Sequence, residues 1–158
     1  MNTEGSFIFW QSPIGQMAIA SDGNAITRAS FMPADWCEAL PRRESPLLRE
    51  ACRQLEEYFK GERKSFSVPL APQGTSFRRR VWQVLESIGY GQTLSYAQVA
   101  QKAGNPRACR AVGGANHANP IVLFIPCHRV IAADGSLGGY GAGVNRKRFL
   151  LELEKKHS

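Results

Sequence analysis

The chain has 158 residues, which is enough for one compact domain or two small lobes and too few for a large multidomain enzyme. With 43% hydrophobic and 21% charged residues, its composition is typical of a folded globular protein and argues against disorder. No apolar run approaches the roughly 20 residues that a membrane-spanning helix needs. The N-terminus carries Glu4 and no basic cluster, so we expect neither a membrane span nor a secretory signal.

The net charge of +7 is concentrated in the second half of the chain. Residues 1–75 hold 8 basic and 9 acidic side chains, whereas residues 76–158 hold 12 basic and 4 acidic ones. Such a basic half suggests a polyanionic partner, most often nucleic acid, and a solubilising surface charge explains it equally well. The four cysteines lie far apart without a C-x-x-C pair, so we expect neither a disulfide framework nor a zinc ribbon. We therefore expect the protein to work in a reducing cytoplasm.

The first third of the chain predicts a small antiparallel meander followed by a helix. Three short apolar or alternating runs are separated by turn residues: 7–10, 16–20 and 25–31. Ser45 and Pro46 are a helix N-cap and a first helical residue, and Gly61 ends the predicted helix. Residues 61–75 are rich in Pro, Gly and Ser without a sustained period, so we place the lobe boundary there, giving lobes 1–72 and 73–158.

The second half predicts mostly helices. The first covers 76–88 and has three arginines in its first turn, Arg78, Arg79 and Arg80. Positive charge at a helix N-terminus opposes the helix dipole, so these side chains suit phosphate binding better than helix stability, although a solvated charge run is the commoner case.

A helix-turn-helix pattern follows. A capping box at Ser95 to Gln98 predicts a helix to about Ala103, residues 104–106 break it, and a second helix covers 107–117. The second helix is mostly Ala and Gly, which leaves two interpretations open: close packing against another helix, or DNA contact with few base-reading side chains.

Residues 121–125 form a continuous apolar run, which predicts a short buried strand leading to Cys127. A turn-rich stretch follows, and Asn145 is predicted to cap a final helix over 146–155. A thiol reacts as its thiolate, and the His128 and Arg129 that follow Cys127 could lower its pKa. Adjacent strand residues face opposite ways, so His128 would reach the sulfur only through a turn or a water molecule; a bare Cys-His pair is more often inert.

The longer string NPIVLFIPCHRV (119–130), preceded by RAVGGAN and followed by GGYGAG, closely resembles the O6-alkylguanine-DNA alkyltransferases, in particular the bacterial Ogt-like branch. The similarity runs from about Ser76 to Glu154, and the first lobe resembles the family only in length and element order. The resemblance implies an α/β protein. Its N-terminal lobe would be an α+β domain like ribonuclease H, and its C-terminal lobe a winged-helix-like domain with the helix-turn-helix.

The resemblance also implies the chemistry, which is that of a methylated-DNA–protein-cysteine methyltransferase. Cys127 would take the alkyl group from guanine O6 irreversibly, so that each molecule acts once. His128 would act as a base through a water molecule, oriented by Glu154, and Tyr96 would protonate guanine N3. Asn119 would tie the second helix of the helix-turn-helix to the turn that carries Cys127. The base pocket would be lined by Val130, Gly138, Tyr140 and Gly141.

By the same resemblance, the partner is double-stranded DNA carrying O6-alkylguanine, with O4-alkylthymine as a second candidate substrate. The damaged base must be flipped out of the stack, and Arg110 would fill the vacated space. The second helix would enter the minor groove, which requires small side chains. The further DNA contacts would come from Tyr96, Ala108, Cys109, Gly113, Asn105 and Arg78. We expect a monomer without a cofactor, and no metal, because the first 75 residues hold two cysteines and no histidine.

Two departures from the family pattern concern the substrate range: Gly141 lacks a hydroxyl that some members place near guanine O6, and Ala142 interrupts the usual glycine pattern. A third, Cys109, stands on the presumed DNA face where alanine is common. Three other functions compete. A branch of the family flags damage without repairing it and has tryptophan in place of Cys127. A winged-helix transcription factor would need more base-reading side chains on residues 107–117. A cysteine hydrolase would need an oxyanion hole, and it would turn over a thioester many times.

Overall fold

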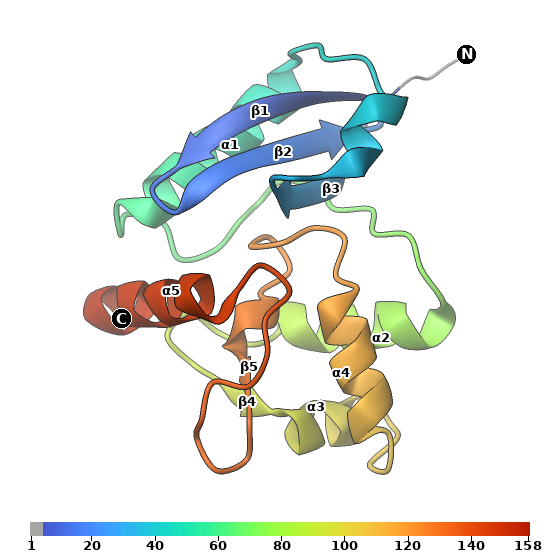
Figure 1. Ribbon diagram of the computed structural model, residues 1–158, viewed down its shortest axis with the longest axis vertical. Helices are drawn as coiled ribbons and strands as arrows, with labels where there is room; N and C mark the ends of the chain where they lie inside the picture. Colours follow the sequence, from blue (N-terminus) through green and yellow to red (C-terminus); the bar gives the residue numbers. More distant parts are fainter. Residues whose placement is uncertain (1–4) are drawn as a thin grey trace. The chain divides into compact units, whose positions relative to one another are not determined.

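The computed structural model describes residues 5–158, and the chain forms two compact units (Figure 1). The first unit contains the chain up to Gln73 together with Pro120–Phe124, and the second contains Gly74–Asn119 and Ile125–Ser158. The predicted single boundary between residues 72 and 73 does not include the short segment 120–124, which belongs to the first unit although it lies within the second half of the chain.

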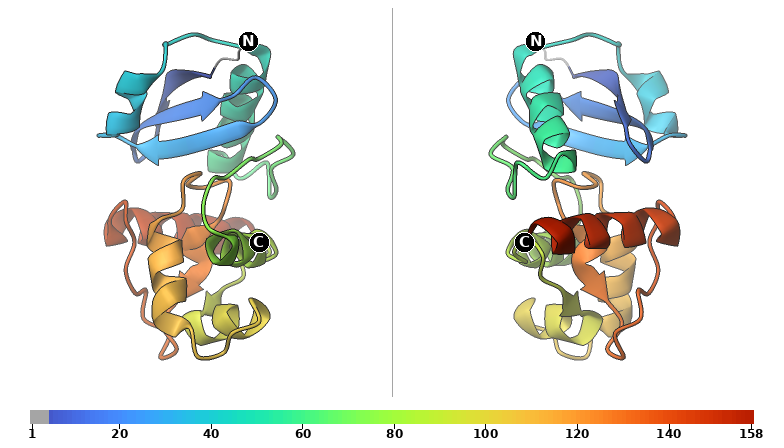
Figure 2. Two further views of the ribbon diagram at one scale, coloured as in Figure 1. Left: turned by 90° about the vertical axis from the view of Figure 1, so that its right-hand side faces the viewer. Right: turned by 90° about the vertical axis from the view of Figure 1, so that its left-hand side faces the viewer.

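The first unit is an antiparallel three-stranded sheet with one long helix, as the alternation pattern predicts. The strands β1 (Ser6–Ser12), β2 (Gly15–Ser21) and β3 (Ile26–Phe31) pair in that order. The helix α1 (Pro46–Phe59) covers one face of the sheet (Figure 2). Its N-terminus is capped by Ser45, whose hydroxyl accepts the N–H of Leu48 over 3.2 Å. A short 3₁₀ helix, η1 (Asp35–Ala39), precedes α1 and is missing from the sequence-based prediction.

The second unit consists of four helices and a small parallel sheet. The helices are α2 (Ser76–Glu86), α3 (Tyr96–Lys102), α4 (Cys109–His117) and α5 (Val144–His157). Strand β4 (Leu94–Ser95) pairs with β5 (Val130–Ile131). The predicted capping box of Ser95 and Gln98 is confirmed, because both of its hydrogen bonds form. Buried Trp82 of α2 donates from Nε1 to the carbonyl of Ala115 in α4 over 2.8 Å, which fixes these two helices against each other.

The prediction of a strand at 121–125 is wrong. Residues 121–125 form isolated bridges and a turn instead of a strand. Ile121 pairs with Ala29 of β3, and Leu123 adopts a positive φ of 76°. The backbone of Ala29 bonds the Pro120 carbonyl and the Val122 N–H, both over 2.9 Å. The run is apolar because all of its residues except half-buried Val122 are buried, and a short apolar run does not by itself distinguish a strand from a buried turn.

Two further local predictions differ from the structure. Cys127 does not end a strand, because Cys127–Arg129 form a short 3₁₀ helix, η2. Asn145 is not an N-cap: α5 begins at Val144, and Gly143 occupies the cap position with a φ of 102°, a conformation that favours glycine. Asn145 instead lies in the first turn, where its side-chain oxygen accepts from Arg148 over 3.1 Å. Within residues 5–158, no helix is both long and apolar enough to cross a membrane.

Candidate active site and DNA-binding surface

The active-site turn η2 is held in place by two amide side chains from the end of α4. Asn119 donates to the carbonyl of Ile125 over 2.8 Å, and Asn116 donates to the carbonyl of Cys127 over 3.3 Å. Both amides are buried. The structure thus places Asn119, just after α4, against the segment that leads into the Cys127 turn, and it adds Asn116 as a direct tie between α4 and Cys127.

Cys127 is a buried thiol with only 3% of its surface exposed. Burial raises its pKa to about 11, although the Asn119 amide, the Lys147 charge and the Tyr140 hydroxyl each favour the thiolate. The thiol is therefore protonated at neutral pH, and a reaction at sulfur requires a base. The suggestion that Arg129 activates Cys127 is not supported, because its guanidinium is bonded to other groups, described next.

His128, Arg129 and Glu154 form a buried cluster beside the thiol turn. His128 Nε2 lies 2.7 Å from Glu154 Oε2, and Arg129 reaches the two oxygens of the same carboxylate over 2.9 and 3.0 Å. The second terminal nitrogen of Arg129 donates to the carbonyl of Ile88 over 2.6 Å. Burial opposes ionisation of Glu154, but the hydrogen bonds and charges of His128 and Arg129 hold its pKa at about 2.

This cluster leaves His128 ready to accept a proton. Burial lowers the pKa of His128, and the Glu154 hydrogen bond and charge oppose this only in part, so the ring is neutral at neutral pH. A neutral imidazole bonded to a carboxylate carries its proton on the nitrogen that makes that bond, here Nε2. Nδ1 is then the acceptor, and within residues 5–158 it is buried without a hydrogen-bond partner.

A buried lysine, which sequence reasoning missed, supports the other side of the turn. Lys147 Nζ donates to the carbonyls of Val130 and Gly139 over 2.5 and 3.1 Å, and the side chain is fully buried. Lys147 and Glu154 are seven residues apart on α5 and so lie on one face of the helix, two turns apart. One helix face therefore binds both the active-site segment and the glycine-rich loop.

The predicted pocket residues lie around this loop. Gly138 has a φ of 71°, and a Cβ at its position would lie 3.0 Å from the Tyr96 hydroxyl, so the backbone and the phenol are in close contact. The Tyr140 hydroxyl lies beside the Cys127 thiol. Burial raises the pKa of Tyr96, and a charged Cys127 would raise it further, so the phenol keeps its proton. Val130 is buried in β5, and Gly141 is exposed.

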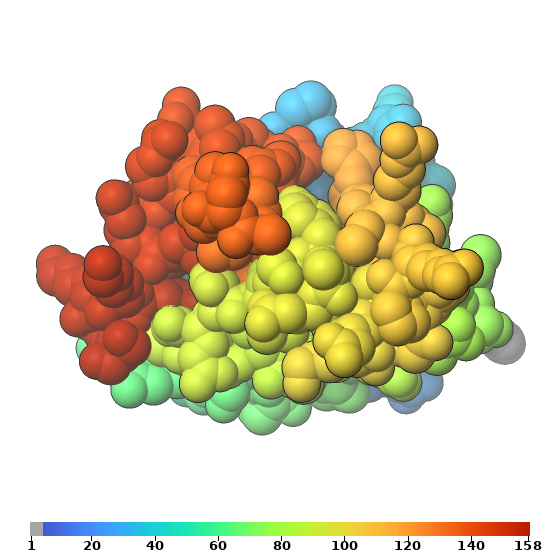
Figure 3. Space-filling model, turned by 90° about the horizontal axis from the view of Figure 1, so that it is seen from below, coloured from blue at the N-terminus to red at the C-terminus, as the bar shows by residue number. Residues whose placement is uncertain are grey.

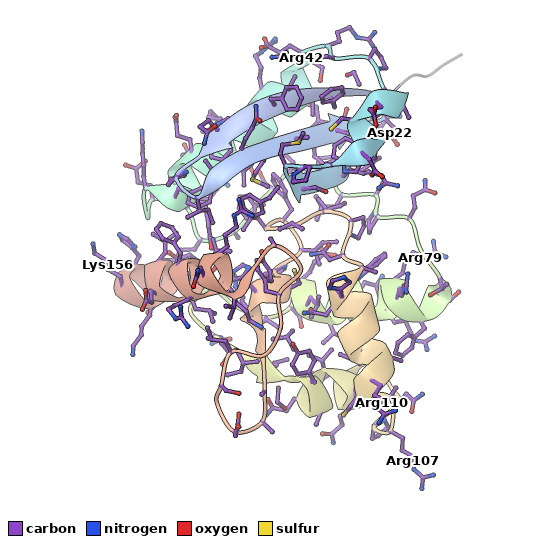
Figure 4. The ribbon with its side chains drawn as sticks, viewed as in Figure 1. Asp22, Arg42, Arg79, Arg107, Arg110 and Lys156 are labelled. Carbon is purple, nitrogen blue, oxygen red and sulfur yellow. The ribbon has the colours of Figure 1, made fainter. Side chains whose placement is uncertain are left out.

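The predicted DNA contacts divide between two places. Helices α3 and α4 pack side by side and form much of the face seen in Figure 3. Arg110 is exposed there, and Figure 4 shows it projecting from the start of α4 together with Arg107, which the sequence-based prediction did not include. Asn105 and Cys109 are also exposed at this end of α4, and Ala108 and Gly113 are half-buried. Arg78 is exposed in the first turn of α2; its neighbour Arg79 lies well apart from Arg110 in Figure 4.

Comparison with known proteins gives matches along the whole chain. Residues 7–72 match the 6-O-methylguanine DNA methyltransferase ribonuclease-like domain, and residues 76–156 match the DNA binding domain of the same name. The chain belongs to the 6-O-methylguanine DNA methyltransferase family. The predicted combination of a ribonuclease-like lobe with a DNA-binding lobe is thereby confirmed.

Individual relatives are similar over nearly their full length. The methylated-DNA–protein-cysteine methyltransferase of Methanosarcina acetivorans is 46% identical over 156 residues, covering 94% of this chain and 97% of the relative. The crystal structure of the Mycobacterium tuberculosis O6-methylguanine methyltransferase superposes with a TM-score of 0.92 at 42% identity, covering 98% and 95% of the two chains. The complex of the M. tuberculosis protein with DNA gives a TM-score of 0.90 at 44% identity, covering 97% and 94%.

Among the site residues of this family member, sequence reasoning missed Asn116 and Lys147 and misjudged Arg129. All three are buried polar residues whose partners lie 8 to 41 positions away in the chain. Two features of the sequence could have indicated their burial. Arg129 is a charged residue in a short apolar stretch, and Lys147 lies seven residues before Glu154 and so on the same face of the predicted helix. In residues 5–158, no three His, Cys, Asp or Glu side chains come together as a set of metal ligands.

Proposed function

We propose that this chain repairs DNA by moving the alkyl group of O6-alkylguanine to Cys127 in a single, irreversible turnover. The observation that carries the proposal is the buried arrangement of Cys127, His128 and Glu154 in a member of this family. The nucleophile is a protonated thiol, the neighbouring imidazole has an acceptor nitrogen, and a carboxylate fixes the tautomer of that imidazole. This is the order of nucleophile, base and orienting group that nucleophilic catalysis requires.

In the proposed reaction, the Cys127 thiol passes its proton to His128 Nδ1 through a water molecule. The sulfur then forms a bond to the alkyl carbon while the bond from that carbon to guanine O6 breaks. Tyr96 gives its proton to guanine N3, so that the base leaves uncharged. The proton gained by His128 restores the phenol, and the base exchanges its N3 proton for one on N1 through water, so that the products are a thioether and an intact guanine. Because a thioether carbon–sulfur bond is not reversed by thiol exchange, the protein is consumed.

The target base lies inside a duplex, so it must be flipped out before the buried sulfur can reach it. The α4 surface supports this step in our proposal. Its small residues Ala108, Cys109 and Gly113 permit a close approach to the minor groove, and Arg110 extends from the same helix to fill the vacated stack. Asn105 and Arg78 would contact the DNA backbone. The solved complex of the M. tuberculosis relative with DNA supports DNA as the partner.

The protein would act on this DNA as a monomer in the cytoplasm, which suits its four free cysteines. The alkylated base would lie between Tyr96 and the loop at Gly138 to Gly141, with Val130 and Tyr140 completing the pocket. None of these steps requires a bound cofactor, because the nucleophile, the base and the proton donor are all side chains of the chain itself.

The deciding experiment is mass spectrometry of the intact protein and its peptides after mixing with a duplex that contains one O6-methylguanine. We expect a stoichiometric gain of one CH₂ on the peptide that contains Cys127, with no turnover. Cys127→Ala should abolish this gain and keep most of the DNA affinity. Tight binding of the wild type without a mass change would support a damage-recognition function. Multiple turnover of a thioester without methyl transfer would support a hydrolase.

A further inference from the structure

His117 lies against Gly141, one of the two glycines that were predicted to line the base pocket. A Cβ placed on Gly141 would lie 3.5 Å from Nδ1 and 3.6 Å from Cε1 of the His117 ring, both ordinary contact distances. The imidazole therefore covers the backbone of Gly141 and occupies the space next to it. His117 is the last residue of α4 and is exposed.

The ring of His117 is not committed to another contact in the described part of the chain. The other two histidines use their ring nitrogens within the protein: His128 Nε2 pairs with Glu154, and His157 Nδ1 bonds the Leu153 carbonyl. No such bond holds the imidazole of His117 within residues 5–158. The ring faces and nitrogen atoms of His117 can therefore contact a substrate group that lies beside Gly141.

The loop from Gly138 to Gly141 thus has an aromatic ring at each end. Tyr96 of α3 contacts the Gly138 end, at 3.0 Å from the Cβ position, and His117 of α4 contacts the Gly141 end. Tyr140, whose hydroxyl lies beside the Cys127 thiol, belongs to the same loop. A flat base held along this loop would have one edge near Tyr96 and the opposite edge near His117.

We propose that His117 is a specificity-determining residue that limits the size of the group carried on guanine O6. The inference rests on the proposed function, in which Tyr96 meets guanine N3. N3 and C6 are opposite atoms of the six-membered purine ring, so a base whose N3 faces Tyr96 directs C6 and its oxygen toward the far end of the loop. The O6 substituent then lies near the imidazole. Small groups fit beside it, and bulky groups collide with it.

The test compares transfer rate constants for O6-methylguanine and O6-benzylguanine placed in the same duplex sequence. For His117→Ala we expect the ratio of benzyl to methyl rate constants to rise about fivefold or more, because removing the ring relieves crowding of the larger group. For His117→Trp we expect the ratio to fall. His157→Ala is the matched control, since it removes a histidine bonded within α5, and it should leave the ratio unchanged.

An unchanged ratio in His117→Ala, with methyl transfer intact, would overturn the inference. Equal losses for both substrates would also overturn it, because they would indicate a contribution to DNA binding or folding rather than to substrate size. His117 is exposed, so its removal leaves no buried cavity that could unfold the protein. Failure of the wild type to transfer either group would instead refute the proposed function on which the inference rests.

Discussion

Arg129 and Glu154 form a buried ion pair in which two guanidinium nitrogens donate to the two carboxylate oxygens over 2.9 and 3.0 Å. His128 shares one of these oxygens at 2.7 Å. The carboxylate thus fixes the tautomer of the ring and neutralises the charge of the guanidinium, and it also accepts the backbone N–H of Gly91 over 3.2 Å. Arg129 holds Glu154 ionised and in place, and its donors are bonded to Glu154 and to the Ile88 carbonyl.

Removing one partner of this pair should destabilise the fold strongly. We expect Arg129→Met to lower the free energy of unfolding by about 3–5 kcal/mol, because it leaves the buried Glu154 charge with less compensation. Urea denaturation at pH 7 measures this change. The matched control is Arg49→Ala, which breaks an exposed ion pair with Glu44 and should cost about 0–1 kcal/mol. A loss for Arg129→Met as small as that of the control would contradict the structural assignment.

Local signals in the sequence predicted the caps at Ser45 and Ser95 but not the one at Gly143, and pairings over long distances could not be predicted. Ser45 and Ser95 cap helices as expected because a capping hydroxyl and its N–H partner are three residues apart. The burial of Arg129 depends on Glu154, which is 25 positions away, and no local pattern shows it. Residues 121–125 look like a strand because burial, rather than strand pairing, made them apolar. For the site itself, the residues alone pointed to Cys127 and His128, whereas Glu154 and the role of each residue could be named only through the family resemblance of the longer string.

We expect Arg110 to affect the rate of alkyl transfer from duplex DNA but not the rate of transfer from the free base. Base flipping costs a few kcal/mol, and a side chain that fills the vacated stack repays part of that cost. We therefore expect Arg110→Ala to lower the rate of methyl transfer from duplex DNA by about tenfold or more, while the reaction with free O6-benzylguanine changes little. Second-order rate constants for both substrates provide the measurement.

Arg107→Ala is the control for general electrostatic effects, because Arg107 is an exposed arginine next to the start of α4. It should weaken DNA binding in a salt-dependent way and leave the flipping step intact. If Arg110→Ala reduced the rates on duplex and free base equally, the flipping role would be wrong, and Arg110 would act on the pocket or on the fold.

The resting state of the nucleophile can be tested by the pH dependence of its reactivity. Only the thiolate reacts with iodoacetamide, and burial raises the pKa of the Cys127 thiol to about 11. Below that pH the thiolate fraction grows with pH, so modification of Cys127 should accelerate about tenfold per unit between about pH 7 and 10. Peptide mass spectrometry should therefore find exposed Cys109 modified well before Cys127 at about pH 7.5, and Cys109→Ser should remove the early product. Urea should make the two cysteines react alike, since unfolding removes the burial. Modification of Cys127 as fast as Cys109 at that pH would mean that a thiolate already exists in the resting protein, and His128 would then have no proton to accept.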